Sequence, residues 1–295
     1  MADIYVLYNP LSGNGKGEED ARLLEVVLPE PIFFFNITKI TNYSAFLSGL
    51  AADDCLIIAG GDGTLNRFVN DTAGIDIPQQ ILYFPIGNSN DFAREFGKQE
   101  YDDPFPVAEY LNELPTVEVK GKTYHFLNGV GFGLDGYCCE EGERLRKIPG
   151  KKVNYTSIAV KGLLLRFAAR NATVTVDGRE YTYNKVWIAP TMYGKYCGGG
   201  MIPVPEQDRE NPEKSLSVML LHGAGRLRTL RVFPGIFKVT HVKHKDMVAI
   251  HTGHEITVEF DRPTPLQFDG ETILNVTSYT ARSAFCKSKA EAIHI

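Results

Sequence analysis

The feature that most constrains the fold is an alternation of short apolar runs and helix-like stretches in the N-terminal part of the chain. The apolar, strand-like runs are residues 3–8, 32–37, 55–59 and 81–85. The helix-like stretches are residues 18–28, 42–51, 91–96 and one that Thr64 would cap and that continues to Val69. This alternation predicts a parallel sheet with helices on both faces.

Three loops rich in Gly and Asn each follow one of these strands, at residues 9–17, 60–63 and 87–90. Ligands of such sheets bind beyond the carboxyl ends of the strands, so we expect the loops to gather at one edge. The backbone N–H groups of the glycines can face an anion. Asp62 would repel a phosphate unless a divalent cation lay between them, and Asp91 would add a second carboxylate. The alternative is a tight strand-to-helix turn with Asp62 as the N-cap.

After Thr123 the pattern changes to strand-like segments separated by Gly, Pro and Asp turn signals. The segments are residues 172–177, 180–189, 216–221, 247–251, 255–260 and 272–280, with a helix-like stretch at 155–169. This half predicts a mostly antiparallel sheet or sandwich. We therefore expect an α/β domain at residues 1–123 and an antiparallel β-sandwich domain at 124–283, with a cleft between them. Residues 284–295 could pack back onto the first domain.

Composition and charge exclude several classes of protein. The net charge of −5 argues against general nucleic-acid binding, which needs a basic surface. Cys138 and Cys139 are adjacent, which suits neither a metal motif nor a disulfide framework, so we expect free thiols in a reducing compartment. No apolar run is long enough to span a bilayer and no signal peptide is visible. We expect a soluble, cytoplasmic protein whose membrane contact, at the inner face, is peripheral.

Six short motifs follow one another along nearly the whole chain. They are Asn-Pro-Leu-Ser-Gly at 9–13, Gly-Gly-Asp-Gly-Thr at 60–64 with Asn66, Asn-Asp-Phe-Ala-Arg at 90–94, Gly-Phe-Gly-Leu-Asp at 131–135, Gly-Gly-Gly-Met at 198–201 and Phe-Asp-Gly-Glu at 268–271. In this order they resemble the diacylglycerol kinase catalytic-domain family, which includes bacterial lipid kinases and sphingosine kinases. The Gly-Gly-Asp-Gly motif alone is also similar to those of NAD kinases and phosphofructokinases.

The resemblance implies a Rossmann-like nucleotide-binding domain of the NAD kinase and lipid kinase type, followed by a β-sandwich. It implies Mg²⁺-dependent transfer of the γ-phosphoryl group of ATP to the hydroxyl of a diacylglycerol-like or sphingoid-like lipid at a membrane surface. In this family Asp62 and Asp91 would organise Mg²⁺, Glu271 would be the general base, and Asp269 would orient Glu271 or the cation. The implied ATP-binding residues are Asn9, Pro10, Ser12, Gly13, Thr41, Gly60, Gly61, Asp62, Gly63, Thr64, Asn66 and Asn88. The alternative for residues 269–271 is a hairpin turn, because Asp-Gly is a strong hairpin signal.

Two positions depart from the family pattern. Asn88 stands where the family usually has Thr, so an amide replaces a hydroxyl. Related bacterial enzymes carry Asp-Gly-x-Leu-Asp-Val, linked to a second, regulatory metal site, where this chain has Glu-Lys-Ser-Leu-Ser-Val at 213–218. Glu213 could still ligate a cation, but Ser217 lacks the carboxylate and Lys214 adds a repelling charge. We do not expect the second site to survive.

Two other functions stay open at this point: an NAD kinase-like phosphotransferase, and a catalytically idle regulator that binds nucleotide or lipid. A homodimer is compatible with the sequence. Basic runs at residues 238–245 and 144–152 could touch anionic headgroups, although a solvated face is the alternative for both.

Overall fold

The computed structural model describes residues 2–146, 148, 153 and 155–286, and the chain forms two compact units, Met1–Glu113 and Leu114–Ile295. The division falls before Thr123, where the pattern of the sequence changes. The reason is that β6 (Thr116–Val119) pairs with β7 (Lys122–His125) and with β15 (Glu271–Arg282), far along the chain. The expectation that residues 284–295 pack onto the first unit falls mostly outside the described residues.

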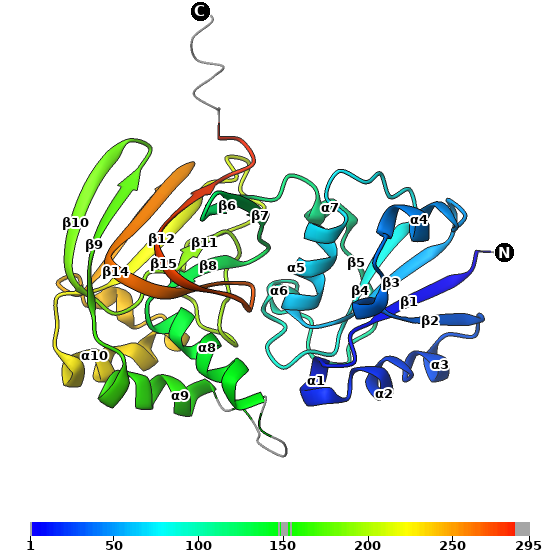
Figure 1. The fold of residues 1–295 in the computed structure, drawn as a ribbon, viewed down its shortest axis with the longest axis horizontal. Helices are drawn as coiled ribbons and strands as arrows, with labels where there is room; N and C mark the ends of the chain where they lie inside the picture. The colour runs from blue at the N-terminus through cyan, green and yellow to red at the C-terminus, as the bar shows by residue number, and fades with distance from the viewer. Residues whose placement is uncertain (1, 147, 149–152, 154, 287–295) are drawn as a thin grey trace, which may run out of the picture. The chain divides into compact units, whose positions relative to one another are not determined.

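The first unit is built on a sheet of order β2-β1-β3-β4-β5 (Figure 1). Its strands are β1 (Ile4–Tyr8), β2 (Ile32–Asn36), β3 (Cys55–Gly60), β4 (Gln80–Pro85) and β5 (Phe105–Pro106). The first four are parallel, and only the short edge strand β5 is antiparallel. The predicted parallel sheet is therefore confirmed. The strand order changes direction between β1 and β3, which is where ligands of such folds bind.

Helices cover both faces of this sheet, as predicted. They are α1 (Ser12–Gly15), α2 (Gly17–Ala21), α3 (Leu24–Val27), η1 (Ile37–Lys39), α4 (Tyr43–Ser48), α5 (Asp62–Asp71), α6 (Asp91–Glu95) and α7 (Ala108–Leu111). On one face, Val6 and Ile57 pack with Ala21 and Leu24 of α2 and α3. Aromatic pairs fill the other face, among them the ring of Tyr43 on α4 with Phe68 on α5 and that of Tyr83 on β4 with Phe92 on α6.

The second unit is an antiparallel β structure whose long hydrogen-bonded path runs β13-β12-β11-β8-β14-β15-β6-β7, with β9 paired to β14 and β10 paired to β9. Its further strands are β8 (Gly129–Phe132), β9 (Arg170–Val176), β10 (Arg179–Val186), β11 (Thr191–Met192), β12 (Leu216–Leu221), β13 (Val248–Gly253) and β14 (Glu255–Phe268). The first part of β14 pairs with β9, and its last residues pair with β8. Its register against β15 shifts between Glu259 and Thr264, so one bent strand serves both parts of the predicted β-sandwich.

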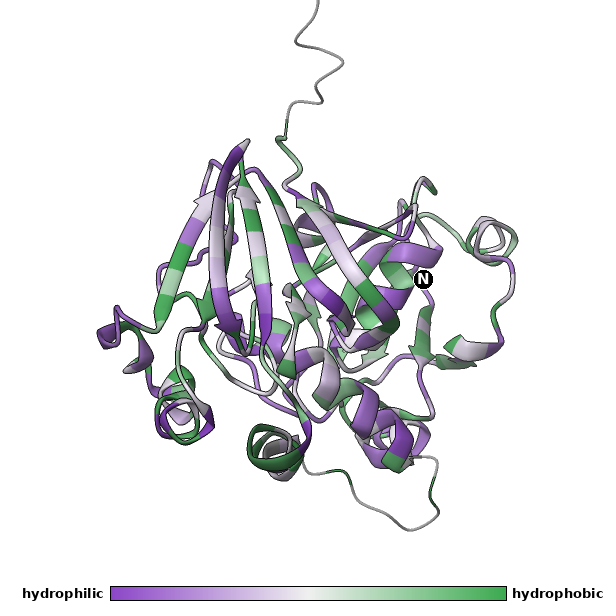
Figure 2. Ribbon diagram, turned by 60° about the vertical axis from the view of Figure 1, so that its left-hand side comes forward, coloured by the Kyte–Doolittle hydropathy of each residue, from purple (hydrophilic) through white to green (hydrophobic). Residues whose placement is uncertain are grey.

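Helices close the core of this unit. They are α8 (Leu134–Arg146), α9 (Tyr155–Lys161), the π-helix η2 (Gly162–Arg166), α10 (Arg226–Val232), η3 (Phe233–Lys238) and η4 (His241–Lys243). Their buried side chains join a cluster around Trp187, Met219 and Leu221. Figure 2 shows the alternation of hydrophilic and hydrophobic residues along the long strands, which is the pattern that predicted them. Within the described residues, no helix is both long and apolar enough to cross a bilayer.

Candidate active site

The three loops after β1, β3 and β4 are held together by side-chain hydrogen bonds. Asn9 Nδ2 donates to Thr64 Oγ1 over 2.9 Å, and Ser12 Oγ lies 3.3 Å from the same hydroxyl. Asn14 Nδ2 donates to Asn88 Oδ1 over 2.9 Å. These bonds join the first loop to each of the other two, so the predicted gathering at one edge of the sheet is confirmed.

Glycine is required where two of these loops touch. A Cβ atom on Gly87 would lie 2.3 Å from the Cα atom of Gly61, and one on Gly60 would lie 2.4 Å from the Cβ atom of Thr64. Gly13 has a φ of +57°, a left-handed conformation that other residues rarely adopt. The loops after β3 and β4 therefore approach each other backbone to backbone, which a side chain larger than hydrogen at Gly87 would prevent.

Asp62 does not cap its own helix. It is the first residue of α5, whose N-cap is Gly61, and Thr64, the cap expected from the sequence, is inside the helix. The Asp62 carboxylate instead accepts hydrogen bonds from two backbone N–H groups of α6, those of Asp91 at 2.9 Å and Phe92 at 2.8 Å. Asp62 thus fixes the loop after β3 to the helix after β4.

A second carboxylate stands beside this contact. The side chain of Asp91 is 5% exposed, with its Oδ1 atom 3.8 Å from Arg94 Nε. The pKa of the buried Tyr83 phenol is raised well above its usual value by burial and, next, by the charges of Asp62 and Asp91. Both carboxylates therefore create a negative potential in one place. Paired carboxylate oxygens are ligands that Mg²⁺ prefers, so these residues fit the predicted cation.

The remaining predicted nucleotide residues have different settings. Thr41 lies in an exposed bend between η1 and α4, after β2, and Pro10 lies in the turn after β1. Asn66 is 1% exposed inside α5, where Asn70 Nδ2 donates to its carbonyl and its side-chain oxygen. Asn66 is therefore buried within the helix that follows the loop, whereas Asn88 is exposed at the loop surface.

In the second unit, Asp269 and Gly270 form the two-residue turn of the β14–β15 hairpin. Phe268 pairs with Glu271 across the turn, and the two turn residues have φ values of +45° and +96°. The hairpin interpretation of this motif is therefore correct for its backbone. Glu271 is the first residue of β15, and it is exposed.

The Asp269 carboxylate is bound by the backbone of the segment that leads into β8. It accepts hydrogen bonds from the N–H groups of Leu127, of Asn128 at 2.9 Å and of Gly129 at 3.2 Å. Asp269 is 8% exposed. Its carboxylate therefore holds the turn that carries Glu271 against β8.

Gln267 supports the same turn and was not singled out from the sequence. Its Oε1 atom accepts from Gly270 N at 3.0 Å, and its Nε2 atom donates to Asp135 Oδ2 at 2.8 Å. Burial raises the pKa of the Asp135 carboxyl, and the bond from Gln267 opposes that shift. The only sequence signal was Asp135 itself, at the end of the 131–135 motif.

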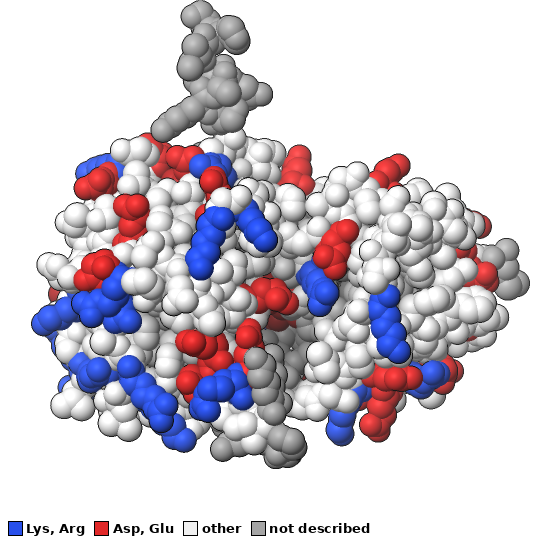
Figure 3. All heavy atoms as spheres, in the orientation of Figure 1, with Lys and Arg blue, Asp and Glu red and all other residues white. Residues whose placement is uncertain are grey.

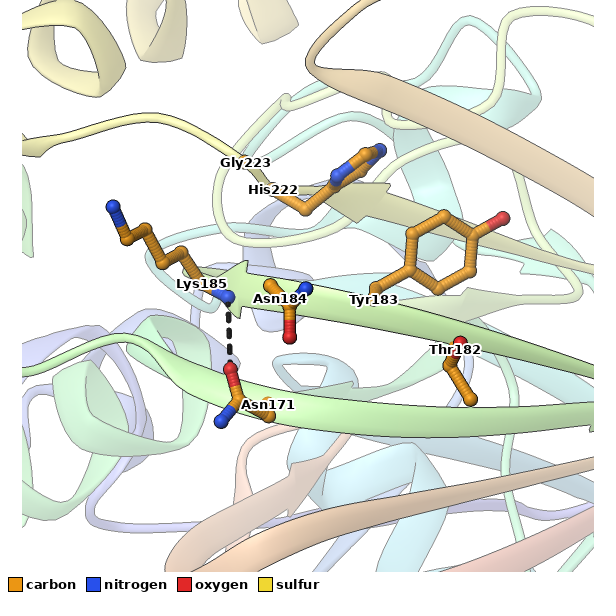
Figure 4. Close-up of a pocket in the computed structure, with 7 residues that line it drawn as sticks. All are labelled: Asn171, Thr182, Tyr183, Asn184, Lys185, His222 and Gly223. Atoms are coloured by element: carbon orange, nitrogen blue, oxygen red, sulfur yellow. Dashed lines mark hydrogen bonds between the residues drawn. The ribbon is translucent and has the colours of Figure 1, made fainter.

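One hollow of about 720 Å³ lies within the second unit, near the start of β9, the end of β10 and the segment after β12 (Figure 4). Its lining residues are Asn171, Thr182, Tyr183, Asn184, Lys185, His222 and Gly223. Asn171 Oδ1 accepts a hydrogen bond from the backbone N–H of Lys185, which joins β9 to β10. None of these residues was predicted as part of the site.

Family models match both units. The diacylglycerol kinase catalytic domain matches residues 3–119, and the YegS C-terminal NAD kinase beta sandwich-like domain matches residues 128–283. The chain therefore belongs to the diacylglycerol kinase catalytic-domain family. More particularly, it joins that catalytic domain to a β-sandwich of the YegS type, which confirms the predicted C-terminal β-sandwich.

Individual relatives agree with this assignment. A Mycobacterium tuberculosis protein named diacylglycerol kinase is 28% identical over 198 residues, which cover 64% of this chain and 62% of that protein. The match thus spans less than two thirds of the relative's length. A crystal structure of a diacylglycerol kinase from Bacillus anthracis str. Sterne has a TM-score of 0.61 at 20% identity, covering 96% of this chain and 94% of that one. This second likeness concerns the fold alone.

Proposed function

We propose that this chain transfers the γ-phosphoryl group of ATP to the hydroxyl of a diacylglycerol-like or sphingoid-like lipid. The observation that carries the proposal is the meeting of three glycine-containing loops and two carboxylates at the carboxyl edge of a parallel sheet. The relative named diacylglycerol kinase supports the choice of a lipid hydroxyl as acceptor.

On the nucleotide side, residues 9–13 and 60–64 would bind the phosphates through backbone N–H groups and through the hydroxyls of Ser12 and Thr64. Thr41 and Asn88 would contact the rest of the nucleotide from the surface. Asp62 and Asp91 would hold Mg²⁺, which lowers the repulsion between the phosphates and an incoming oxygen. Because Asp62 is already hydrogen-bonded to α6, the carboxylate is held in place before the nucleotide arrives.

On the acceptor side, Glu271 would take the proton of the lipid hydroxyl. The lipid oxygen then forms a bond to the γ-phosphorus while the bond from that phosphorus to the β,γ-bridging oxygen breaks, which yields a phosphorylated lipid and ADP. Asp269 acts as a positioning residue, since its carboxylate binds the backbone beside β8.

The test is an assay of the purified protein with Mg²⁺, γ-labelled ATP and a panel of diacylglycerol, sphingosine, phosphatidylglycerol and NAD. Label in a lipid that is lost with Glu271→Gln supports the proposal. Label in NADP would instead favour an NAD kinase. Absence of any labelled product, with ATP still bound, would favour a catalytically idle regulator.

We also propose that the second unit reaches its lipid through a face formed by α9, η2 and α10, called here the leucine face. Its most exposed large hydrophobic residues are Leu165 and Leu227, at 78% and 79%. Arg226 donates through Nη1 to the carbonyl oxygens of Leu163 and Phe167, at 2.7 Å each. Arg226 is the neighbour of Leu227, and Leu163 and Phe167 lie on either side of Leu165 along the chain. The two hydrogen bonds therefore join the segment that carries Leu227 to the segment that carries Leu165.

Charge complements the apolar residues of the leucine face. The three helices, residues 155–166 and 226–232, contain five Lys and Arg residues and no Asp or Glu, and Arg228 is paired with Asp246. Figure 3 shows Lys and Arg gathered over the region of α9 and α10. Exposed leucines beside basic residues are typical of helices that lie on an anionic bilayer. Of the other predicted basic run, Lys147, Lys151 and Lys152 lie outside the described residues.

Co-sedimentation with phosphatidylglycerol vesicles at low and high salt tests the leucine face. The double variant Leu165→Ser, Leu227→Ser should bind less at both salt concentrations, and wild-type binding should weaken with salt. Leu274→Ser is the control, because Leu274 is an exposed leucine of β15, a strand that pairs with β14 and β6. Equal loss of binding in the control would contradict the assignment.

A further inference from the structure

We propose that two cations of the chain itself, Arg209 and Lys214, cross-link the loop before β12 in place of a second divalent cation. We further propose that Arg209 thereby positions the turn that carries Glu271. The second part rests on the proposed role of Glu271 as general base. The family resemblance implies a regulatory metal at residues 213–218, and the contacts of these residues do not fit one.

The side-chain oxygen atoms of Glu213 and Ser217, which could bind a metal, either face solvent or take part in other hydrogen bonds. The side chain of Glu213 is 78% exposed, with an oxygen 3.9 Å from His254 Nε2. The hydroxyl of Ser217 is hydrogen-bonded to Thr252 Oγ1 at 2.8 Å, between β12 and β13. The described part of the chain contains no group of three or more His, Cys, Asp or Glu side chains that could hold a metal ion.

Lys214 places a positive charge within this loop. Its Nζ atom donates to the carbonyl oxygen of Arg209 at 2.9 Å, and its backbone N–H donates to Asn211 O at 2.8 Å. Its φ of +47° is left-handed, a conformation that a side chain with a Cβ adopts only when its surroundings hold it there. A carbonyl oxygen is also a common ligand of hard divalent cations. The ammonium group thus occupies by a hydrogen bond an oxygen of the kind that a metal ion would coordinate, and its charge repels a metal ion.

Arg209 carries the link from the loop to the hairpin turn. It is 2% exposed, and its Nη2 atom donates to Asn128 Oδ1 at 3.0 Å. The guanidinium carbon lies 5.6 Å from the centre of the Tyr193 ring. Burial of a guanidinium is costly, so it persists where its hydrogen bonds and ring contacts compensate.

Asn128 joins Arg209 to the turn. Its backbone N–H donates to Asp269 Oδ1 at 2.9 Å, and its carbonyl accepts from the N–H groups of Tyr193 and Gly194, both at 2.9 Å. The path from the loop to Glu271 is therefore continuous: Arg209 holds Asn128, Asn128 holds Asp269, and Asp269 lies two residues before Glu271. Displacement of a reacting group by about 1 Å can cost on the order of 100-fold in rate.

The first experiment tests for a second metal site. At a fixed concentration of MgATP, excess free Mg²⁺ should leave the wild-type rate unchanged. Without nucleotide, neither Mg²⁺ nor a chelator should shift the thermal midpoint of the Asp62→Asn variant. Binding of Mn²⁺ without nucleotide is measured by electron paramagnetic resonance in Asp62→Asn, which removes a predicted ligand in the first unit. Bound Mn²⁺ that Glu213→Gln abolishes, or activation by free Mg²⁺ that the same substitution abolishes, would overturn the proposal.

The second experiment tests the positioning role. Arg209→Met should lower kcat by roughly 10- to 100-fold with KM for MgATP unchanged. Arg209→Lys should recover part of kcat, because an ammonium can still donate to Asn128 Oδ1. Arg262→Met is the control, since Arg262 is an exposed arginine of the same unit. If Arg209→Met keeps wild-type kcat per folded molecule, Arg209 does not position the turn.

A third variant guards against loss of folding in Arg209→Met. Asn128→Leu removes the same link, so it should lower kcat similarly, and the double variant Arg209→Lys, Asn128→Leu should lose no more than Asn128→Leu alone. Additive losses would overturn the proposed path. The Mn²⁺ and thermal measurements do not depend on the acceptor, so they remain decisive for the loop even if no lipid is phosphorylated and the proposed function fails.

Discussion

Asp62 in the first unit and Asp269 in the second make the same kind of contact in two different settings. Each lies in a glycine-containing motif, and each accepts backbone hydrogen bonds from another segment, Asp62 from α6 and Asp269 from the segment leading into β8. Asp62 stands beside a second carboxylate, that of Asp91, whereas Asp269 lies two residues before an exposed glutamate. The difference teaches that one kind of structural contact occurs in two settings, to which the proposed function assigns cation binding in the first unit and placement of a base in the second.

The largest effect is expected at Glu271, which would mark the second unit as the source of the base. Glu271→Gln should lower kcat by roughly 10²- to 10⁴-fold, because the amide cannot accept the lipid proton. ATP affinity and the thermal midpoint should stay near wild type, since the side chain is exposed. Steady-state kinetics and calorimetric ATP binding check this. Near-normal turnover would show that another group accepts the proton.

Paired substitutions of the two aspartates test the comparison directly. Asp62→Asn and Asp269→Asn should each cost about 1–3 kcal/mol of unfolding free energy, because an amide N–H₂ would face a backbone N–H. Asp62→Asn should also weaken MgATP binding by about tenfold. Asp269→Asn should lower kcat and leave the affinity for MgATP unchanged. Denaturant titration measures the unfolding free energy, and calorimetry measures the affinity for MgATP. Weak MgATP binding in Asp269→Asn would break the distinction.

A smaller effect is expected where the two glycine loops of the first unit meet. Gly87→Ala would place a methyl group 2.3 Å from the Gly61 Cα atom and should cost about 1–3 kcal/mol of stability, together with nucleotide affinity. Gly225→Ala is the control, because nothing lies within 4 Å of its added Cβ atom. Equal losses of stability in both variants would show that the close approach has no special cost.

The smallest effect concerns pH and the second unit. Burial raises the folded-state pKa of Asp135, so the folded protein binds this proton more tightly than the unfolded chain does. Its contribution to stability is therefore present below the unfolded pKa and is lost as pH rises toward the folded pKa. Asp135→Asn should remove that loss. The variant should therefore gain more unfolding free energy over the wild type at neutral pH than at mildly acidic pH.

An opposite case serves as the control for this prediction. Asp246 is exposed, and its hydrogen bond with Arg228 lowers its pKa, so its contribution is lost as pH falls. Asp246→Asn should therefore reduce the unfolding free energy slightly at neutral pH and leave it unchanged at acidic pH. Urea titrations across pH measure both variants, and a shift of the same sign in the two would contradict the assignment for Asp135.

Local patterns predicted most of the first unit. The apolar runs became β1 to β4, and the gathering of their loops followed from the parallel arrangement. The long helix expected at residues 18–28 is instead two short helices, α2 and α3, and Thr64 is not a cap. Its hydroxyl bonds to Asn9 and Ser12, which are 55 and 52 residues away along the chain and so leave no local signal.

The site in the second unit was less accessible to sequence reasoning, since its contacts connect distant segments. Asp269 was expected to orient Glu271 or the cation, but its partners are amides of residues 127–129, which no spacing indicates. Gln267 and Arg209 act through Asp135 and Asn128, each more than 80 residues away. The helices α8 and α10 were also not predicted, because glycines and charges interrupt their apolar pattern.

The bond between Asp62 and the start of α6 has a consequence for how ATP would enter. The first amides of α6 are already occupied by the protein's own anion, so a phosphate has no vacant helix end to compete for there. This edge of the candidate site, where Asp62 meets α6, is thus assembled in the absence of substrate. Nucleotide would meet a preformed edge rather than a segment that must first be ordered, which lowers the entropic cost of binding.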